Sequence, residues 1–86
     1  MTDLEFDVLD ELYFVISFDE LKSATELDTE TLRKVLLGLL HKGWIKCFRD
    51  RIESLSPEEV NFEHDYMRYY YLASKEGLLA HNGQAS

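Results

Sequence analysis

Cysteine, proline and glycine are scarce in this 86-residue chain, which contains one, one and four of them respectively. Because Cys47 stands alone, an internal disulfide is excluded, and a reducing compartment is the expected environment. No apolar run approaches the roughly 18 residues of a membrane span, and the acidic N-terminus differs from a secretory signal, which begins basic. We therefore expect a cytoplasmic protein without a membrane partner, folded as a single domain over residues 1–86.

Sequence signatures of catalysis are also missing. The chain has no GxSxG, GxGxxG, Walker-type or CxxC motif, and neither an HExxH segment nor a Cys/His spacing suited to zinc. The metal-compatible residues Glu63, His64 and Asp65 are adjacent in sequence, which favours a solvated acidic loop. Cys47 is expected to be a small buried hydrophobe, with a redox sensor as the alternative. We predict that the protein is not an enzyme and holds no cofactor or metal.

Positive charge is the third scarcity. Nine Lys and Arg residues face 17 Asp and Glu residues, so the net charge of −8 opposes non-specific attraction to phosphate. The average hides an asymmetry, because six of the nine basic residues lie within 31–51 beside a single acid, whereas residues 1–30 hold ten acids and one lysine. The domain can thus be acidic overall and still present one cationic face.

Hydrophobic periodicity and capping signals divide the chain into short elements. Ser17 and Glu20 fit a capping box, Asp28 is a plausible N-cap, and Gly43 suits the end of a helix. Alternating, aromatic-rich segments after Gly43 and before Ser74 favour strands. The predicted elements are helices over 3–16, 18–25, 29–42 and 75–82, strands over 44–49 and 67–73, and a long acidic connection over 50–66 with a short helix near 57–62. The predicted fold class is therefore α+β and mostly helical.

Two expectations concern single side chains. In the last strand, alternation places Tyr69 and Tyr71 on one face and Tyr70 and Leu72 on the other, and we expect Tyr70 and Leu72 in the core. His81, near the C-terminus, is expected at the surface.

Two motifs carry a family resemblance. "ELDTETLRKVLLGLLHKGWI" resembles the helix of MarR-like and PadR-like bacterial regulators that runs into a lysine-glycine pair and a strand, and "YYYLASKEGLLAHN" is similar to their strand-to-helix ending. The resemblance covers roughly Phe18 to Asn82, apart from the connection 50–66. It implies a winged helix-turn-helix with a two-stranded β-wing, acting as a sequence-specific, duplex-DNA-binding transcription regulator. It also implies a homodimer, because a palindromic site needs two recognition helices one turn apart.

The resemblance also implies which residues would contact DNA. Helix 29–42 would enter the major groove, with Arg33 on a guanine edge or a phosphate and Lys34 on a phosphate. Two threonines near the helix N-terminus would donate to phosphate, and basic residues near the first strand would extend the contact. The predicted DNA-binding residues are Thr29, Thr31, Arg33, Lys34, His41, Lys46, Arg49 and Arg51.

Three departures from a DNA-binding pattern support a rival hypothesis. Glu30 lies near the recognition face, Leu37 is apolar at an outward position, and the connection 50–66 holds six acids against one arginine. The alternative is an acidic winged-helix module for protein–protein interaction that does not bind DNA. A continuous positive stripe through Arg33, Lys34, Lys46 and Arg49 would favour DNA, whereas interruption by Glu30 and the connection would favour the interaction module.

Overall fold

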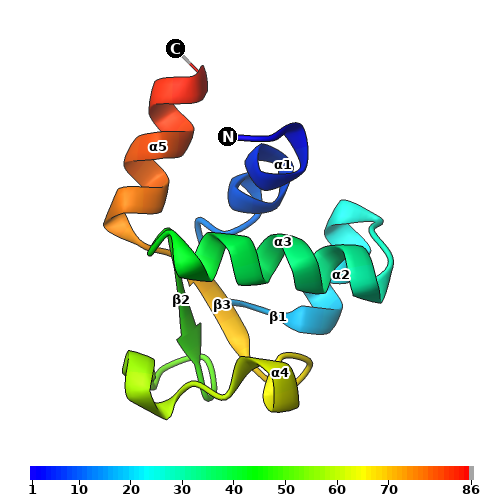
Figure 1. The fold of residues 1–86 in the computed structure, drawn as a ribbon, viewed down its shortest axis with the longest axis vertical. Helices are drawn as coiled ribbons and strands as arrows, with labels where there is room; N and C mark the ends of the chain where they lie inside the picture. The colour runs from blue at the N-terminus through cyan, green and yellow to red at the C-terminus, as the bar shows by residue number, and fades with distance from the viewer. Residues whose placement is uncertain (86) are drawn as a thin grey trace.

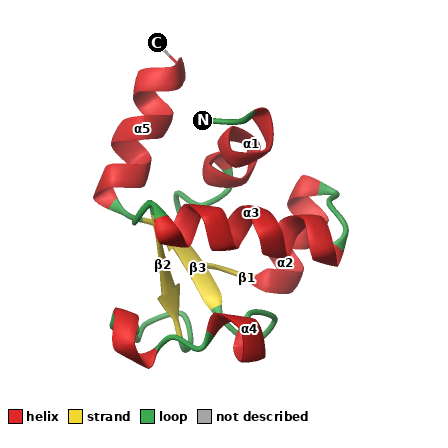
Figure 2. Cartoon of the chain, in the orientation of Figure 1, coloured by secondary structure: helices red, strands yellow, loops and turns green. Residues whose placement is uncertain are grey.

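The computed structural model describes residues 1–85, with side chains described for 1–83, and shows an α+β fold (Figures 1 and 2). The helices in this range are α1 (Asp3–Asp10), α2 (Phe18–Thr25), α3 (Thr29–His41), α4 (Phe62–Asp65) and α5 (Lys75–Ala85). The strands are β1 (Ile16–Ser17), β2 (Ile45–Phe48) and β3 (Tyr70–Ala73), and a 3-10 turn, η1, spans Pro57–Glu59. The predicted α+β class is confirmed.

The sheet has three antiparallel strands in the order β1-β3-β2, and not the two that were predicted. The extra strand comes from the end of the segment expected to be helical, so the predicted helix over 3–16 is wrong beyond Asp10. The run after Leu12 is aromatic and β-branched, which favours extended backbone. Ile16 pairs with Tyr71, and the Leu12 carbonyl accepts a hydrogen bond of 2.8 Å from the Ala73 amide. Pairing with β3 therefore ends the first helix early.

The buried face of β3 is the opposite of the one expected. Tyr71 is fully buried and Tyr69 nearly so, whereas Tyr70 and Leu72 are half-buried on the other face. Tyr71 pairs with Ile16 on one side and with Cys47 on the other, which places its ring at the centre of the sheet. Alternation divides a strand into two faces but does not say which one is covered, because that depends on register with its neighbours.

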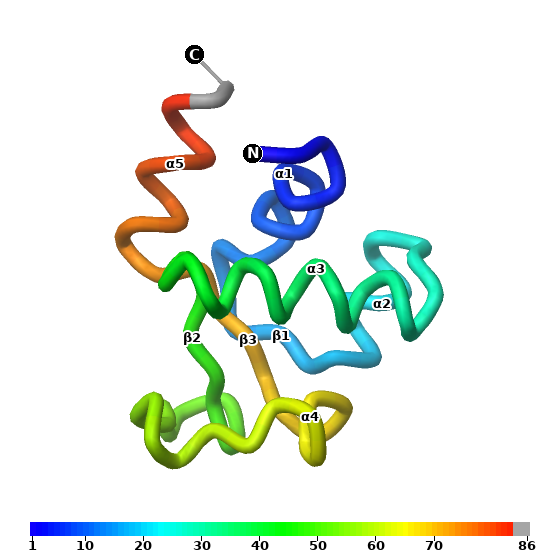
Figure 3. Tube along the Cα trace, in the orientation of Figure 1, coloured from blue at the N-terminus to red at the C-terminus, as the bar shows by residue number. Residues whose placement is uncertain are grey.

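The core is formed where α3 packs against α1, α2 and the sheet. In Figures 1 and 3, α3 runs across the middle of the molecule, with α1 and α5 on one side of it and the sheet on the other. Ser17 and Glu20 form the predicted capping box, with both hydrogen bonds at 3.1 Å. Each fully buried leucine contributes roughly 1.5–3 kcal/mol. The buried cluster consists of Val8, Leu9, Leu12, Phe18, Leu21, Leu32, Leu36, Leu39, Ile45, Cys47, Phe62, Tyr69, Tyr71 and Ala73.

The connection 50–66 folds back toward the helices. The short helix predicted near 57–62 begins at Pro57 as expected, with Ser56 and Glu59 in a capping box, but it is a 3-10 helix that ends at Glu59. The chain becomes extended at Val60 and then forms α4. Phe62 is buried and stacks on Tyr66, with ring centroids 5.5 Å apart, and Tyr66 meets the edge of Phe18 on α2 at 5.4 Å. These aromatic contacts attach α4 to the helical layer.

The start of α5 packs directly on the turn between α3 and β2. Gly43 has the positive φ of 74° expected for the residue after a helix, and the Trp44 amide donates to the Leu39 carbonyl at 3.0 Å. Ser74 Oγ donates to the Gly43 carbonyl at 2.6 Å and accepts from the Gly77 amide at 3.1 Å. A Cβ at position 77 would lie 2.0 Å from the Trp44 carbonyl oxygen, so only glycine fits there.

We predict that Gly77→Ala lowers the free energy of unfolding by about 3 kcal/mol or more, because the Trp44 backbone must shift to admit the methyl group. Gly83→Ala is the matched control in the same helix, since a Cβ there meets nothing within 4 Å. Alanine should leave stability unchanged at that position or raise it by up to about 1 kcal/mol. Urea denaturation followed by circular dichroism measures both, and equal stability of the two variants would contradict the close approach.

Candidate interaction face on α3

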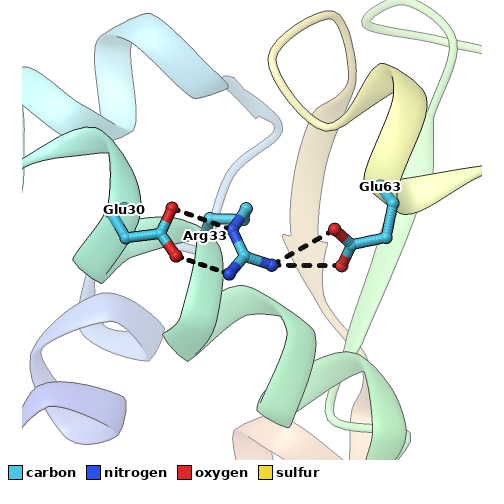
Figure 4. Close-up of polar contacts among 3 residues, drawn as sticks. All are labelled: Glu30, Arg33 and Glu63. Carbon is cyan, nitrogen blue, oxygen red and sulfur yellow. Dashed lines mark hydrogen bonds and ion pairs between the residues drawn. The ribbon is translucent and has the colours of Figure 1, made fainter.

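Arg33, the central residue of the predicted DNA contact, lies between two glutamates (Figure 4). Its Nε donates to Glu30 Oε2 at 3.2 Å and its Nη2 to Glu30 Oε1 at 2.5 Å. Its Nη1 donates to both carboxylate oxygens of Glu63 on α4, at 3.1 and 3.3 Å. The hydrogen bonds between Arg33 and Glu30 raise the pKa of Arg33 and lower the pKa of Glu30, so both of these groups are ionised at neutral pH. All three nitrogens of the guanidinium therefore already have acceptors.

Two tyrosines hold α4 in the position that lets Glu63 reach Arg33. The Asn61 amide, just before α4, donates to the Tyr69 hydroxyl at 2.8 Å. The Tyr71 hydroxyl donates to the Tyr66 carbonyl, just after α4, at 2.6 Å. Tyr71 lies on β3 and Tyr69 directly precedes it, and both rings are buried. The core therefore fixes both ends of α4. Glu63 is thereby placed against α3, although it is 30 residues from Arg33 in the chain.

The arginines predicted near the strand end are also paired with acids. Arg51 donates to Glu20 Oε1 at 2.7 Å and to the Val15 carbonyl at 3.2 Å, and its guanidinium lies 5.2 Å from the centre of the Tyr70 ring. The Nε of Arg49 lies 3.8 Å from the Oε1 of Glu53. These exposed pairs contribute little to stability, but they reduce the positive charge offered to a phosphate.

Five predicted contact residues are not in ion pairs among the residues that the structure describes. Lys34 and His41 are exposed on α3, seven residues apart and therefore on the same side of the helix, and Lys46 is exposed on β2. Thr29 and Thr31 are half-buried at the start of α3. The structure thus separates the predicted set into three arginines held in ion pairs and five residues outside the ion pairs of the described residues. Glu30 and Glu63 interrupt the positive stripe at Arg33.

Sequence reasoning identified Glu30 as a misfit on this face but missed Glu63 as the second partner of Arg33. The available signal was the net charge of the connection, six acids against one arginine, in a loop that had to return to β3. Charge count does not give the position of a loop, so the contact could not be derived from it.

An apolar groove borders the same helix. Its volume is about 520 Å³, and it lies between the second half of α3, strand β2 and the connection. Leu37, the apolar residue at an outward position of α3, forms one wall. The lining residues are Leu37, Leu40, His41, Gly43, Ile45, Lys46, Cys47, Ser54, Leu55, Pro57, Val60, Phe62, Ser74 and Glu76.

Cys47 contributes to the floor of this groove but is 1% exposed. Burial raises the pKa of its thiol to about 12, so the reactive thiolate is not populated at neutral pH. This supports the expected role as a small buried hydrophobe and opposes the redox-sensor alternative.

The expected surface position of His81 is wrong, because the residue is 5% exposed. Its ring stacks on Phe6 of α1 with centroids 4.2 Å apart, and its Nδ1 lies 2.8 Å from the Tyr13 hydroxyl. Helical pattern alone did not predict this, because the contact needs α1 and α5 to lie side by side. His81 therefore joins the two helices.

Within residues 1–85, no cluster of three or more His, Cys, Asp or Glu side chains is arranged to hold a metal ion. In the same part of the chain, no helix combines the length and apolar character that a membrane crossing demands.

No family model matches this chain. The searches of curated proteins and of solved structures also found no match. The structure itself shows a small α+β fold with a three-stranded antiparallel sheet.

The burial of Cys47 predicts a loss of stability at alkaline pH. The folded pKa is about 12 and the unfolded value about 8.5, so the unfolded chain releases its proton first. The thiol's contribution is fully present below the unfolded pKa and is lost as the pH rises through the folded pKa. We expect the free energy of unfolding to fall above pH 8.5 by up to about 1.4 kcal/mol per pH unit.

The measurement is a series of urea denaturation curves from pH 7 to 10. Cys47→Ala is the control, and it should be less stable throughout but nearly independent of pH between about 8.5 and 9.5. Ionisation of the unfolded tyrosines adds above that range, because burial also raises the pKa of Tyr71. The same slope in both proteins would contradict the role of the thiol.

Proposed function

We propose that the chain is a winged helix-turn-helix domain, similar to MarR-like and PadR-like domains, that acts as an acidic protein–protein interaction module and does not bind DNA through α3. The order of elements supports the domain type. Helix α2, a short turn and the longer α3 precede two antiparallel strands, β2 and β3, and a final helix. The two sequence motifs lie on α3–β2 and on β3–α5, where the resemblance requires them.

The observation that carries the functional part is the clamp on Arg33. A guanidinium that contacts a guanine edge presents two parallel N–H groups to it, and here those groups are bound to Glu30 and Glu63. Two carboxylates around one cation leave a negative charge where a DNA phosphate would approach. Inserting this face into a major groove would require Glu63 to move and Glu30 to lie beside phosphate, both of which are unfavourable.

The charge of the whole chain agrees with a basic partner. At a net charge of −8, long-range attraction accelerates encounter with cationic surfaces and slows encounter with nucleic acid. A positive stripe through Arg33, Lys34, Lys46 and Arg49 would favour DNA binding. Because Glu30 and Glu63 interrupt it at Arg33, the interaction module is favoured. The proposal assigns the domain no catalytic step.

A DNA-binding transcription regulator remains the second candidate, and specific residues favour it. Lys34 and Lys46 are exposed and unpaired within the described residues, and His41 is exposed between them in the sequence. If α4 moved away, Arg33 would lose Glu63 and keep Glu30 as its acidic partner, which would free its Nη1 group for a phosphate. This candidate would act as a homodimer, and exposed apolar residues on α1 and α5, Leu4 and Leu79, are available for a contact between copies.

Fluorescence anisotropy with a labelled pool of random duplex DNA tests the proposal from low to moderate salt. We expect no saturable binding by the wild type at low ionic strength. Salt-sensitive binding that is lost in the Arg33→Ala, Lys34→Ala double variant would overturn the proposal in favour of the regulator.

A pair of charge-matched variants shows whether the clamp is responsible. Glu30→Gln with Glu63→Gln removes both negative charges beside Arg33, whereas Glu11→Gln with Glu58→Gln removes the same charge from exposed residues that do not contact it. We expect the first variant to bind DNA measurably more tightly than the second. Equal binding would mean that net charge, and not the clamp, keeps DNA away.

A further inference from the structure

The groove beside α3 has the size and lining of a binding site. Its volume of about 520 Å³ falls within the range of ligand pockets, and most of its walls are aliphatic or aromatic. Leu37 and Leu40 come from α3, Ile45 from β2, and Val60 and Phe62 from the connection. Leu37, Leu40 and Val60 are only half-buried, so apolar surface in the groove remains exposed.

The groove also opens beside the edge of the sheet. Strand β2 lies at the edge, and backbone hydrogen bonds from the connection reach it at Cys47 and Arg49, where Leu55 and Glu53 pair with it. Ile45, at the start of the strand, is not covered in this way and lines the groove. A chain lying in the groove would therefore meet both apolar side chains and the strand edge.

The rim of the groove is acidic. Glu76 lines it from α5, and the exposed Glu58 directly follows the lining residue Pro57 in the chain. Glu59 does not belong to this rim, because it lines a second pocket together with Arg49 and Arg68. Lys46 is the only Lys or Arg among the lining residues, so Glu76 and the adjacent Glu58 exceed it by one negative charge.

We propose that this groove binds an amphipathic segment of a partner protein, with apolar side chains in the groove and basic side chains against Glu58 and Glu76. The inference rests on the proposed function, because it names the surface and the partner chemistry of that interaction module. Apolar anchors in a cleft with oppositely charged residues at the rim are the usual arrangement for capturing an amphipathic segment.

The probe is a synthetic 14-residue peptide of leucines at helical spacing with lysines at all other positions. Two partner peptides isolate its features: one replaces every lysine by glutamate, and one replaces every leucine by serine. Titration into ¹⁵N-labelled protein at physiological salt should shift the amides of Leu37, Ile45, Val60 and Phe62 with the leucine-lysine peptide. We expect its affinity to exceed that of each partner peptide by about tenfold or more.

Matched protein variants separate the groove from the general negative charge. Glu58→Lys with Glu76→Lys should weaken binding about tenfold. Asp7→Lys with Glu11→Lys makes the same charge change on α1 and should weaken it by roughly threefold or less, because salt screens distant charges. Leu37→Asp should abolish binding, whereas Ile52→Asp, at a residue 90% exposed on the connection, should not. All four variants change exposed or half-buried residues. Their ¹⁵N spectra show whether each variant is folded.

Shifts outside the groove, equal loss in the two charge-reversal variants, or equal affinity for the glutamate peptide would each overturn the inference. The absence of peptide binding would overturn it as well. If the wild type also fails to bind DNA in that case, the groove inference alone falls and the interaction module stands. If the wild type binds DNA as described above, the proposed function falls whatever the peptides do.

Discussion

The position of the acidic connection depends on one constraint, which is the burial of Tyr69 and Tyr71 on the inner face of the β3 segment. Both rings lie in the core, and each hydroxyl makes a hydrogen bond to the backbone at one end of α4. A buried hydroxyl without a partner costs about 1–3 kcal/mol, so these bonds are maintained once the rings are buried. The connection is thereby held against the helical layer, and Glu63 lies beside Arg33.

This placement changes what the cations of α3 can do. In sequence, residues 31–51 are strongly basic, but in space the acids that reach them come from other parts of the chain. Glu5 of α1 binds Lys42 at 2.7 Å, Glu20 of α2 binds Arg51, and Glu63 of α4 binds Arg33. Burial alone would raise the pKa of Glu5, but hydrogen bonds from Lys42 and Thr2 outweigh it and lower that pKa. The basic segment is therefore neutralised locally by three separate helices.

The same folding that covers Arg33 leaves the second half of α3 open. Phe62 enters the core at the start of α4, and the chain before it passes along β2 at a distance from Leu37 and Leu40. The groove results from this path, since η1 and the extended residue Val60 form its outer wall. A face that a DNA-binding domain would present as cationic is here apolar at one end and charge-paired at the other.

Local chemistry in the sequence determined the fold class and most of the helices. The Ser17–Glu20 capping box, the leucine spacing of α3 and the glycine at its end depend on residues within a few positions of each other, so helix 18–25 was predicted with its observed bounds and 29–42 to within one residue. The strands after Gly43 and before Ser74 were predicted for the same reason. Contacts between distant segments were decided only by the tertiary structure. They ended the first helix at Asp10, buried Tyr71 instead of Tyr70, and stacked the ring of His81 on that of Phe6. They also divided the candidate site. The charge of Arg33 can be counted from the sequence, whereas its pairing with Glu63 depends on how Tyr69 and Tyr71 pack in the core.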